Sequence, residues 1–218
     1  MPQGCLIQLA IVIVMAVANN MINRCGPDSI YGANIPLSAV GIVMKVFAIV
    51  IAFAVGIGVG GQPIVGYNFG AGNYRRVKET YRAVVLAVCI VGIIAMLLFE
   101  LCPQALISLF GNESELYNQY AQLCFRIFLG GILLTCLQKV SSIFLQSMGR
   151  PLQSTLLSLA RDVVFFVPAL LFLAPRYGVE GMLWAAPIAD VLTGILAALL
   201  VASEMRRLTA LENAPHKH

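Results

Sequence analysis

Long apolar runs alternate with short polar loops along almost the whole chain. Six runs hold about 20 residues each with few charges, which is the length that an α-helix needs to cross a hydrocarbon core of about 30 Å. The second and fourth runs exceed this length and can tilt or extend beyond the hydrocarbon. The pattern predicts an all-α integral membrane protein, a bundle of six transmembrane helices at Cys5–Ile22, Ile35–Gly60, Ala83–Cys102, Tyr120–Phe144, Leu152–Ala174 and Gly181–Ala202.

The loops between these runs alternate in charge. Three segments, around Arg75–Arg82, Lys139–Arg150 and Arg206–Arg207, are basic, whereas the intervening loops carry no net positive charge. Basic loops are retained on the cytoplasmic side of a membrane. The alternation therefore predicts a multi-pass protein of the cell membrane with both termini in the cytoplasm, a lobe over residues 1–207 and a polar cytoplasmic tail at 208–218.

Composition supports a membrane protein and excludes several other classes. Hydrophobic residues make up 60% of the chain and charged residues 11%, against roughly 25% charged residues in soluble domains. The net charge of +4 is spread over several loops, so we expect no nucleic-acid partner. The six cysteines form no C-x-x-C pair, both histidines lie in the tail, and no common hydrolase or nucleotide motif occurs. We therefore expect no metal, no organic cofactor and no enzyme activity.

The stretch from Gly56 to Arg76 is the most distinctive in the chain. Gly56 and Gly60 are spaced by four residues, which favours close packing against another transmembrane helix. Pro63 removes one helix hydrogen bond, and the Gly/Asn-rich segment that follows is typical of a helix end. This stretch is predicted to be a packed helix that breaks and leaves the membrane at the cytoplasmic face.

Four segments of the chain resemble the second half of transporters of the multidrug and toxic compound extrusion family. The most specific is Gln62–Ala71 followed by Arg75-Arg76-Val77, and the others are Gly41–Lys45, Phe144–Arg150 and Pro187–Asp190. The resemblance implies one six-helix lobe of a twelve-helix protein that exports drugs or other amphipathic or cationic small molecules in exchange for H⁺ or Na⁺. It also implies that an amino-terminal six-helix lobe is needed for transport, supplied either by a longer form of this chain or by a separate partner. Within the first segment, the residues expected to be structural or gating are Gln62, Pro63, Gly66, Tyr67, Asn68 and Gly70.

Five ionisable residues are predicted to lie at membrane depth, where a charge is costly and usually faces the interior of a bundle. Arg161 and Asp190 lie about ten residues into neighbouring antiparallel helices, so they can form a pair. Either the pair only locks two helices together, or Asp162 or Asp190 exchanges the coupling ion. Lys45, Arg126 and Arg161 are the candidate charge partners.

Two polar stripes are candidates for the substrate cavity. Thr135, Gln138 and Gln146 recur at helical spacing on the fourth predicted helix, and Gln8 and Asn19 lie on the first. Such a stripe is as often a contact between helices as a cavity lining. Some branches of the resembled family carry a glutamate for cation coupling at the place of Ala10, so a sodium site of that type is not expected here.

Two other functions compete with the transporter lobe. A truncated, non-transporting membrane protein or an interaction subunit would have the same composition and helices. A flippase for lipid-linked oligosaccharides, of distantly similar architecture, would need a cationic cavity to meet phosphate, and Lys45, Arg126 and Arg161 are compatible with one.

Overall fold

A computed structural model describes residues 2–25, 27, 30–32, 34–108 and 115–213 of the chain, and of residues 2–8 only the backbone. Every regular element in this part is helical, as predicted. The elements are α1 (Pro2–Cys25), α2 (Asn34–Gly70), α3 (Tyr74–Leu101), α4 (Pro103–Ser108), α5 (Glu115–Phe128), α6 (Ile132–Ser147), α7 (Pro151–Leu159), the π-helical turn η1 (Ala160–Phe166) and α8 (Val167–Glu212).

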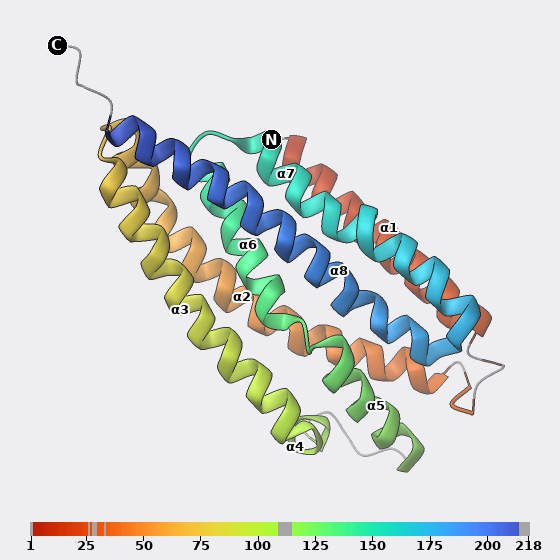
Figure 1. Ribbon diagram of the computed structural model, residues 1–218. Coiled ribbons are helices and arrows are strands. Elements are labelled where there is room, and N and C mark those ends of the chain that lie inside the picture. The colour runs from red at the N-terminus through yellow and green to blue at the C-terminus, as the bar shows by residue number, and fades with distance from the viewer. Residues whose placement is uncertain (1, 26, 28–29, 33, 109–114, 214–218) are drawn as a thin grey trace.

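The long helices form one elongated bundle, with the two ends of the chain at the same end of it (Figure 1). Helix α8 reverses direction at Gly178, whose φ of 64° and ψ of −151° are not helical. A positive φ is readily adopted only by glycine. The continuous helix from α7 through η1 into the start of α8 thus forms one arm, and the remainder of α8 returns beside it (Figure 1).

Three helical segments are long and apolar enough to cross a membrane: Asn34–Gly70, Tyr74–Leu101 and Pro151–Glu212. The pair α5 and α6, bent by 45°, counts as a fourth. Because Pro151–Glu212 folds back at Gly178, it supplies two antiparallel arms, and α1 adds a sixth rod with a shorter apolar part at Leu9–Cys25. The described residues therefore form a six-helix lobe, which confirms the predicted fold class.

Large apolar side chains cover the outside of the bundle as well as its core. On α3, for example, Leu86, Ile90, Ile94 and Leu97 are all about half exposed or more. Contiguous apolar surface of this kind is rare on soluble monomers and is the surface that lipid solvates. The chain is a multi-pass membrane protein.

Helix α2 is longer than the sequence predicts. It continues through Pro63, so a break at this proline is wrong, but it ends at Gly70, within the Gly/Asn-rich segment that the sequence predicts as the helix end. Transmembrane helices tolerate proline because neighbouring groups and local adjustments satisfy the backbone groups it leaves free. The chain turns at Gly72, which has a φ of +74°. Four residues before this turn, the side chain of Asn68 donates a 2.8 Å hydrogen bond to the carbonyl of Ile64.

The glycines of α2 that allow close contact with other helices are not the ones that the sequence predicts. A Cβ added to Gly56 or Gly60 would meet no atom within 4 Å, so neither glycine allows a close approach within this lobe. A Cβ on Gly58 would lie 2.9 Å from Ile143 Cδ1 on α6, and one on Gly61 would lie 2.8 Å from Val84 Cγ2 on α3. The neighbouring pair of glycines in α2 is the one that faces other helices.

Ion pairs connect the basic segments at the end of the bundle where the chain ends lie. Arg150 pairs with the buried Glu204 at 2.6 Å, and Lys78 pairs with Glu212 at 2.5 Å. The predicted basic segments thus lie together at one end, in agreement with the alternating loop charges. Lys139 is the exception: it lies within α6 and not in a loop.

Candidate substrate and coupling site

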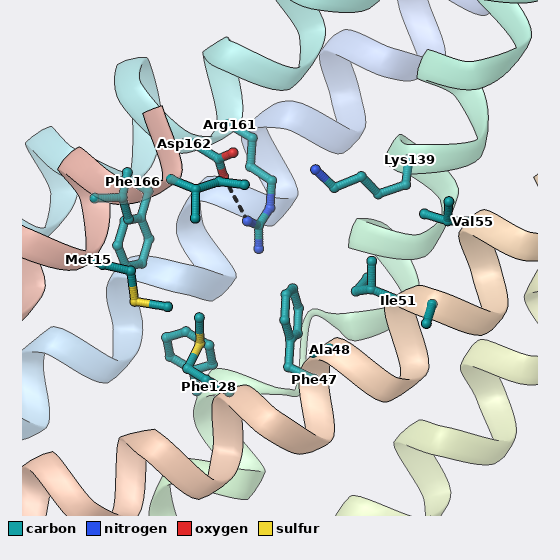
Figure 2. A pocket seen from close by; sticks show the side chains of 14 residues that line it. Met15, Phe47, Ala48, Ile51, Val55, Phe128, Lys139, Arg161, Asp162 and Phe166 are labelled. Atoms are coloured by element: carbon teal, nitrogen blue, oxygen red, sulfur yellow. Dashed lines mark hydrogen bonds and ion pairs between the residues drawn. The ribbon is translucent and has the colours of Figure 1, made fainter. Parts of the chain in front are cut away.

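A cavity of about 470 Å³ lies between α1, α2, the α5–α6 pair and η1 (Figure 2). Most of its lining is apolar or aromatic, including Met15, Met44, Phe47, Phe128 and Phe166. Three charged residues complete the lining: Lys139, Arg161 and Asp162. A mostly apolar cavity with a few polar groups is typical of a small-molecule site.

Arg161 connects two carboxylates. Its Nε donates to Asp190 Oδ1 at 2.8 Å, and its Nη1 donates to Asp162 Oδ1 at 2.9 Å. Asp190 reaches the site from the returning arm of α8 and is only 2% exposed. The guanidinium also lies 5.6 Å from the ring centroid of Phe47. The predicted pair between Arg161 and Asp190 is therefore present, with Asp162 as a second partner.

The π-helical turn η1 holds Arg161 and Asp162 in this position. A π-helix bonds each N–H to the carbonyl five residues earlier, and such turns are rare and frequent at functional sites. This turn begins one residue before Arg161 and includes Asp162 and the cavity residue Phe166. The sequence contains no proline or glycine that would have indicated the turn.

The break between α5 and α6 makes room for Asp190. A Cβ added to Gly131 would lie 2.5 Å from Asp190 Oδ2 and 3.0 Å from its Cβ. Thr135, one turn further along α6, is fully buried, and its hydroxyl donates to the carbonyl of Gly131 at 3.4 Å. Thr135 does not line the cavity, and its role in substrate binding stays a prediction.

Gln138 of this stripe and Ser142, four residues further along α6, contact α7. Gln138 Nε2 donates to the carbonyl of Leu157 at 3.3 Å. The Ser142 hydroxyl lies 2.8 Å from the Ser154 hydroxyl and 3.1 Å from the Ser158 hydroxyl. Of the two interpretations of this stripe, contact between helices is the one that Gln138 and Ser142 show.

Four other candidate residues are exposed and do not line the cavity. They are Asn19, Lys45, Arg126 and Gln146. Lys45 and Arg126 form no ion pair with any described residue, and the side chain of Gln8 lies outside the described part of the chain. The proposed functions of these residues remain predictions, as does the gating role of the residues near Pro63.

Lys139 is the cavity residue that the sequence interpretation missed. It was counted among the loop charges although it lies inside the predicted span Tyr120–Phe144. No hydrogen bond or ion pair joins it to a described residue, and its amino group points into the cavity towards Arg161 (Figure 2). The sequence offered one signal for Lys139: it follows Thr135 by four residues, so both lie on one face of a helix.

Comparison with known proteins establishes the family. The family model described as MatE matches residues 5–171, more than half of the chain. The chain belongs to the MatE family. This confirms the family that the motifs of the sequence resemble, and this family consists of transporters and not of enzymes.

Curated relatives include multidrug export proteins. The chain is 24% identical over 198 residues to the multidrug export protein MepA of Staphylococcus haemolyticus, covering 91% of this chain and 42% of that protein. It is 23% identical over 179 residues to MepA of Staphylococcus aureus strain MSSA476, covering 82% of this chain and 39% of the relative. The chain thus spans less than half the length of these relatives.

Solved MATE structures share the fold. One described as MATE in the straight conformation superposes with a TM-score of 0.83 at 17% identity, covering 95% of this chain and 45% of that one. A transporter of the MOP superfamily from Pyrococcus furiosus, described as having a binding pocket of reverse polarity, gives 0.81 at 17% identity and covers 97% of this chain and 46% of that one. The MatE chain therefore has the architecture of about half of such a transporter.

Proposed function

We propose that this MatE chain is one lobe of a secondary active transporter that exports amphipathic small molecules, driven by H⁺ or Na⁺ moving inward. The observation that supports it best is the Asp190–Arg161–Asp162 cluster, which lies at the wall of a large cavity. Intramembrane charges that meet at a cavity are typical of ion and substrate pathways. The MepA relatives, which are multidrug export proteins, support the export of drugs.

The cluster offers a direct route to coupling. Both carboxylates are hydrogen-bonded to the same guanidinium, so a proton or sodium ion that binds one of them weakens its bond to Arg161. Asp190 lies on the returning arm of α8 and Arg161 on η1, so weakening their 2.8 Å bond loosens the contact between two helical arms. An ion that binds the two packings with different affinity shifts the population between them.

The second lobe completes the transport path in this proposal. Helices of this chain expose apolar surface together with polar side chains such as Asn19 and Gln146. A chamber between two lobes would be lined partly by such exposed residues, and it is there that we place the path of the amphipathic substrates. The second lobe in this proposal is an amino-terminal six-helix lobe of the family, carried by the same protein or by another chain, since the chain matches less than half of the relatives' length.

Efflux of a fluorescent dye tests this function. Cells lacking their own drug exporters would express the chain alone, or together with a six-helix amino-terminal lobe of the family, and the proton and sodium gradients would be collapsed in turn. We expect gradient-dependent efflux with both lobes and its loss in the variant Asp190→Asn. The matched control Glu100→Gln removes an exposed carboxylate near the end of α3 and should leave efflux unchanged. Efflux that persists in Asp190→Asn would refute the coupling role, and no efflux from either combination would favour a non-transporting protein.

The orientation in the membrane is a separate proposal. We place the end of the bundle that holds Asn73 and the chain termini in the cytoplasm, because the basic segments gather there. Cys102 is exposed at the opposite end of α3. A membrane-impermeant maleimide should therefore label Cys102 in intact cells and label an Asn73→Cys variant at its new cysteine only after permeabilisation. The reverse labelling pattern would invert the topology.

A further inference from the structure

The cavity presents more unused hydrogen-bond donors than acceptors. Arg161 uses Nε and Nη1 in its two ion pairs, which leaves Nη2 without a bond to any described residue. That nitrogen and the Lys139 amino group both point into the cavity (Figure 2). The one carboxylate in the lining, Asp162, already accepts a bond from Arg161. A ligand entering the cavity therefore meets free donors first.

The charged side chains at the cavity also favour an anionic group. Lys139 and Arg161 each contribute a positive charge and Asp162 a negative one, whereas Asp190 lies behind Arg161 and does not line the cavity. With Asp190 included, the two carboxylates balance the two cations, but both carboxylates bond Arg161, so Lys139 is the cation that lacks a direct ion pair. The lysine forms no hydrogen bond or ion pair with a described residue, although Asp162 and Asp190 lie near enough to attract it. A cation without a direct partner in an apolar surrounding gains most from an anion.

The remaining lining suits a flat apolar body. Phe47, Phe128 and Phe166 offer aromatic surface, and Met15 and Met44 offer flexible thioethers that adapt to varied shapes. A volume of about 470 Å³ is within the range of small-molecule sites.

We propose that this cavity binds amphipathic ligands through one anionic group, held by Lys139 and assisted by Arg161. The proposal deepens the substrate class of the proposed transporter and rests on that function only in treating the ligand as cargo. Lys139 is the residue that selects the sign of the ligand's charge, and the aromatic and methionine side chains contact its apolar part.

Two naphthalene probes that differ in charge test the proposal. The anionic 1-anilinonaphthalene-8-sulfonate and the neutral N-phenyl-1-naphthylamine share one ring system and both fluoresce when they enter an apolar site. Binding would be measured to the chain in phosphatidylcholine nanodiscs, with empty nanodiscs subtracted. We expect saturable binding of the sulfonate, weakened about tenfold or more in Lys139→Gln, because a hydrogen bond to a charged group is lost. The affinity for the neutral probe should change less than about twofold.

Two further variants separate charge from structure. Lys139→Arg keeps the charge and should retain most of the sulfonate affinity, since Lys139 has no described partner that the exchange would disturb. Arg82→Gln removes a cation from the exposed surface of α3, outside the cavity, and should leave both affinities unchanged. Equal loss of both probes in Lys139→Gln, unchanged sulfonate binding in that variant, or binding of the neutral probe alone would each overturn the proposal.

Competition identifies the source of the anion. Dihexanoylphosphatidic acid represents a lipid phosphate, and naphthalene-2-sulfonate represents a soluble aromatic anion. Stronger displacement by the first would assign the cavity to lipid headgroups, and stronger displacement by the second to soluble amphipaths; either supports an anionic ligand, whereas displacement by neither would contradict it. These measurements need no ion gradient and no second lobe, so a failed efflux assay and a failed binding assay are distinguishable.

Discussion

Replacing Gly131 with alanine should disturb the charge cluster through a single methyl group. The added Cβ would lie 2.5 Å from Asp190 Oδ2, 3.0 Å from its Cβ and 3.1 Å from its Cγ, whereas ordinary van der Waals contact begins at 3.4 Å. The backbone of Gly131, with a φ of −85°, suits alanine, so the clash is the only strain expected there. Asp190 must move away, and its 2.8 Å bond to Arg161 is then stretched or lost.

The size of the effect follows from two contributions. Overpacking of a dense interior costs about 1–3 kcal/mol, and loss of a hydrogen bond to a charged group costs about 1.5–3 kcal/mol. Because Asp162 still balances the charge of Arg161, the second cost is only partly incurred, and we expect a total of about 2–4 kcal/mol. At about 2–4 °C per kcal/mol for a chain of this length, the melting temperature should fall by about 5–15 °C.

Thermal unfolding measured with a thiol-reactive fluorogenic maleimide can detect this change. Cys124 and Cys136 are fully buried and react only when the bundle opens, whereas the exposed Cys102 reacts at once and sets the baseline. The matched control is Gly60→Ala on α2, where an added Cβ meets no atom within 4 Å. Alanine is the better helix former by about 1 kcal/mol, so the control should be as stable as the wild type or more so. A Gly131→Ala protein that melts within about 1 °C of that control would refute the argument.

Two other substitutions test the contacts that hold the bundle together, using the same unfolding assay. Ser142→Ala removes the hydroxyl that lies 2.8 Å from that of Ser154 and should cost about 1 kcal/mol, or about 2–4 °C; no change would mean that the two helices do not need this contact. Arg150→Gln deprives the buried Glu204 of its 2.6 Å partner and should cost about 1–3 kcal/mol. The control Glu79→Gln disrupts an exposed pair and should cost less than about 0.5 kcal/mol, and equal losses in the two variants would contradict the importance of burial.

The pair between Arg161 and Asp190 could be predicted because two simple quantities define it. Each residue lies about ten positions into its helix, and adjacent antiparallel helices place such positions at the same depth. A charge at that depth is costly and is stabilised by a partner of opposite sign. The third member of the cluster, Asp162, was named from the sequence as a coupling candidate, but its bond to the same guanidinium emerged only from the structure.

Helical periodicity could not assign the surroundings of Lys139 or of the glycines of α2. Helical periodicity tells which residues share a face, but in a membrane both lipid and neighbouring helices accept apolar faces, so hydrophobicity does not distinguish them. Gly56 and Gly60 fit the packing pattern as well as Gly58 and Gly61 do, and only the positions of α3 and α6 decide between them.

The sequence by itself determined the membrane class, the six-helix lobe and the family, because apolar length, overall composition and local motifs need no knowledge of neighbours. Tertiary structure alone decided that Gln138 and Ser142 contact α7 and that Lys139 faces the cavity. The physical reason is that these assignments depend on the rotation of α6 after the break at Gly131. That rotation is set by packing against several helices at once, and no local pattern in the chain encodes it.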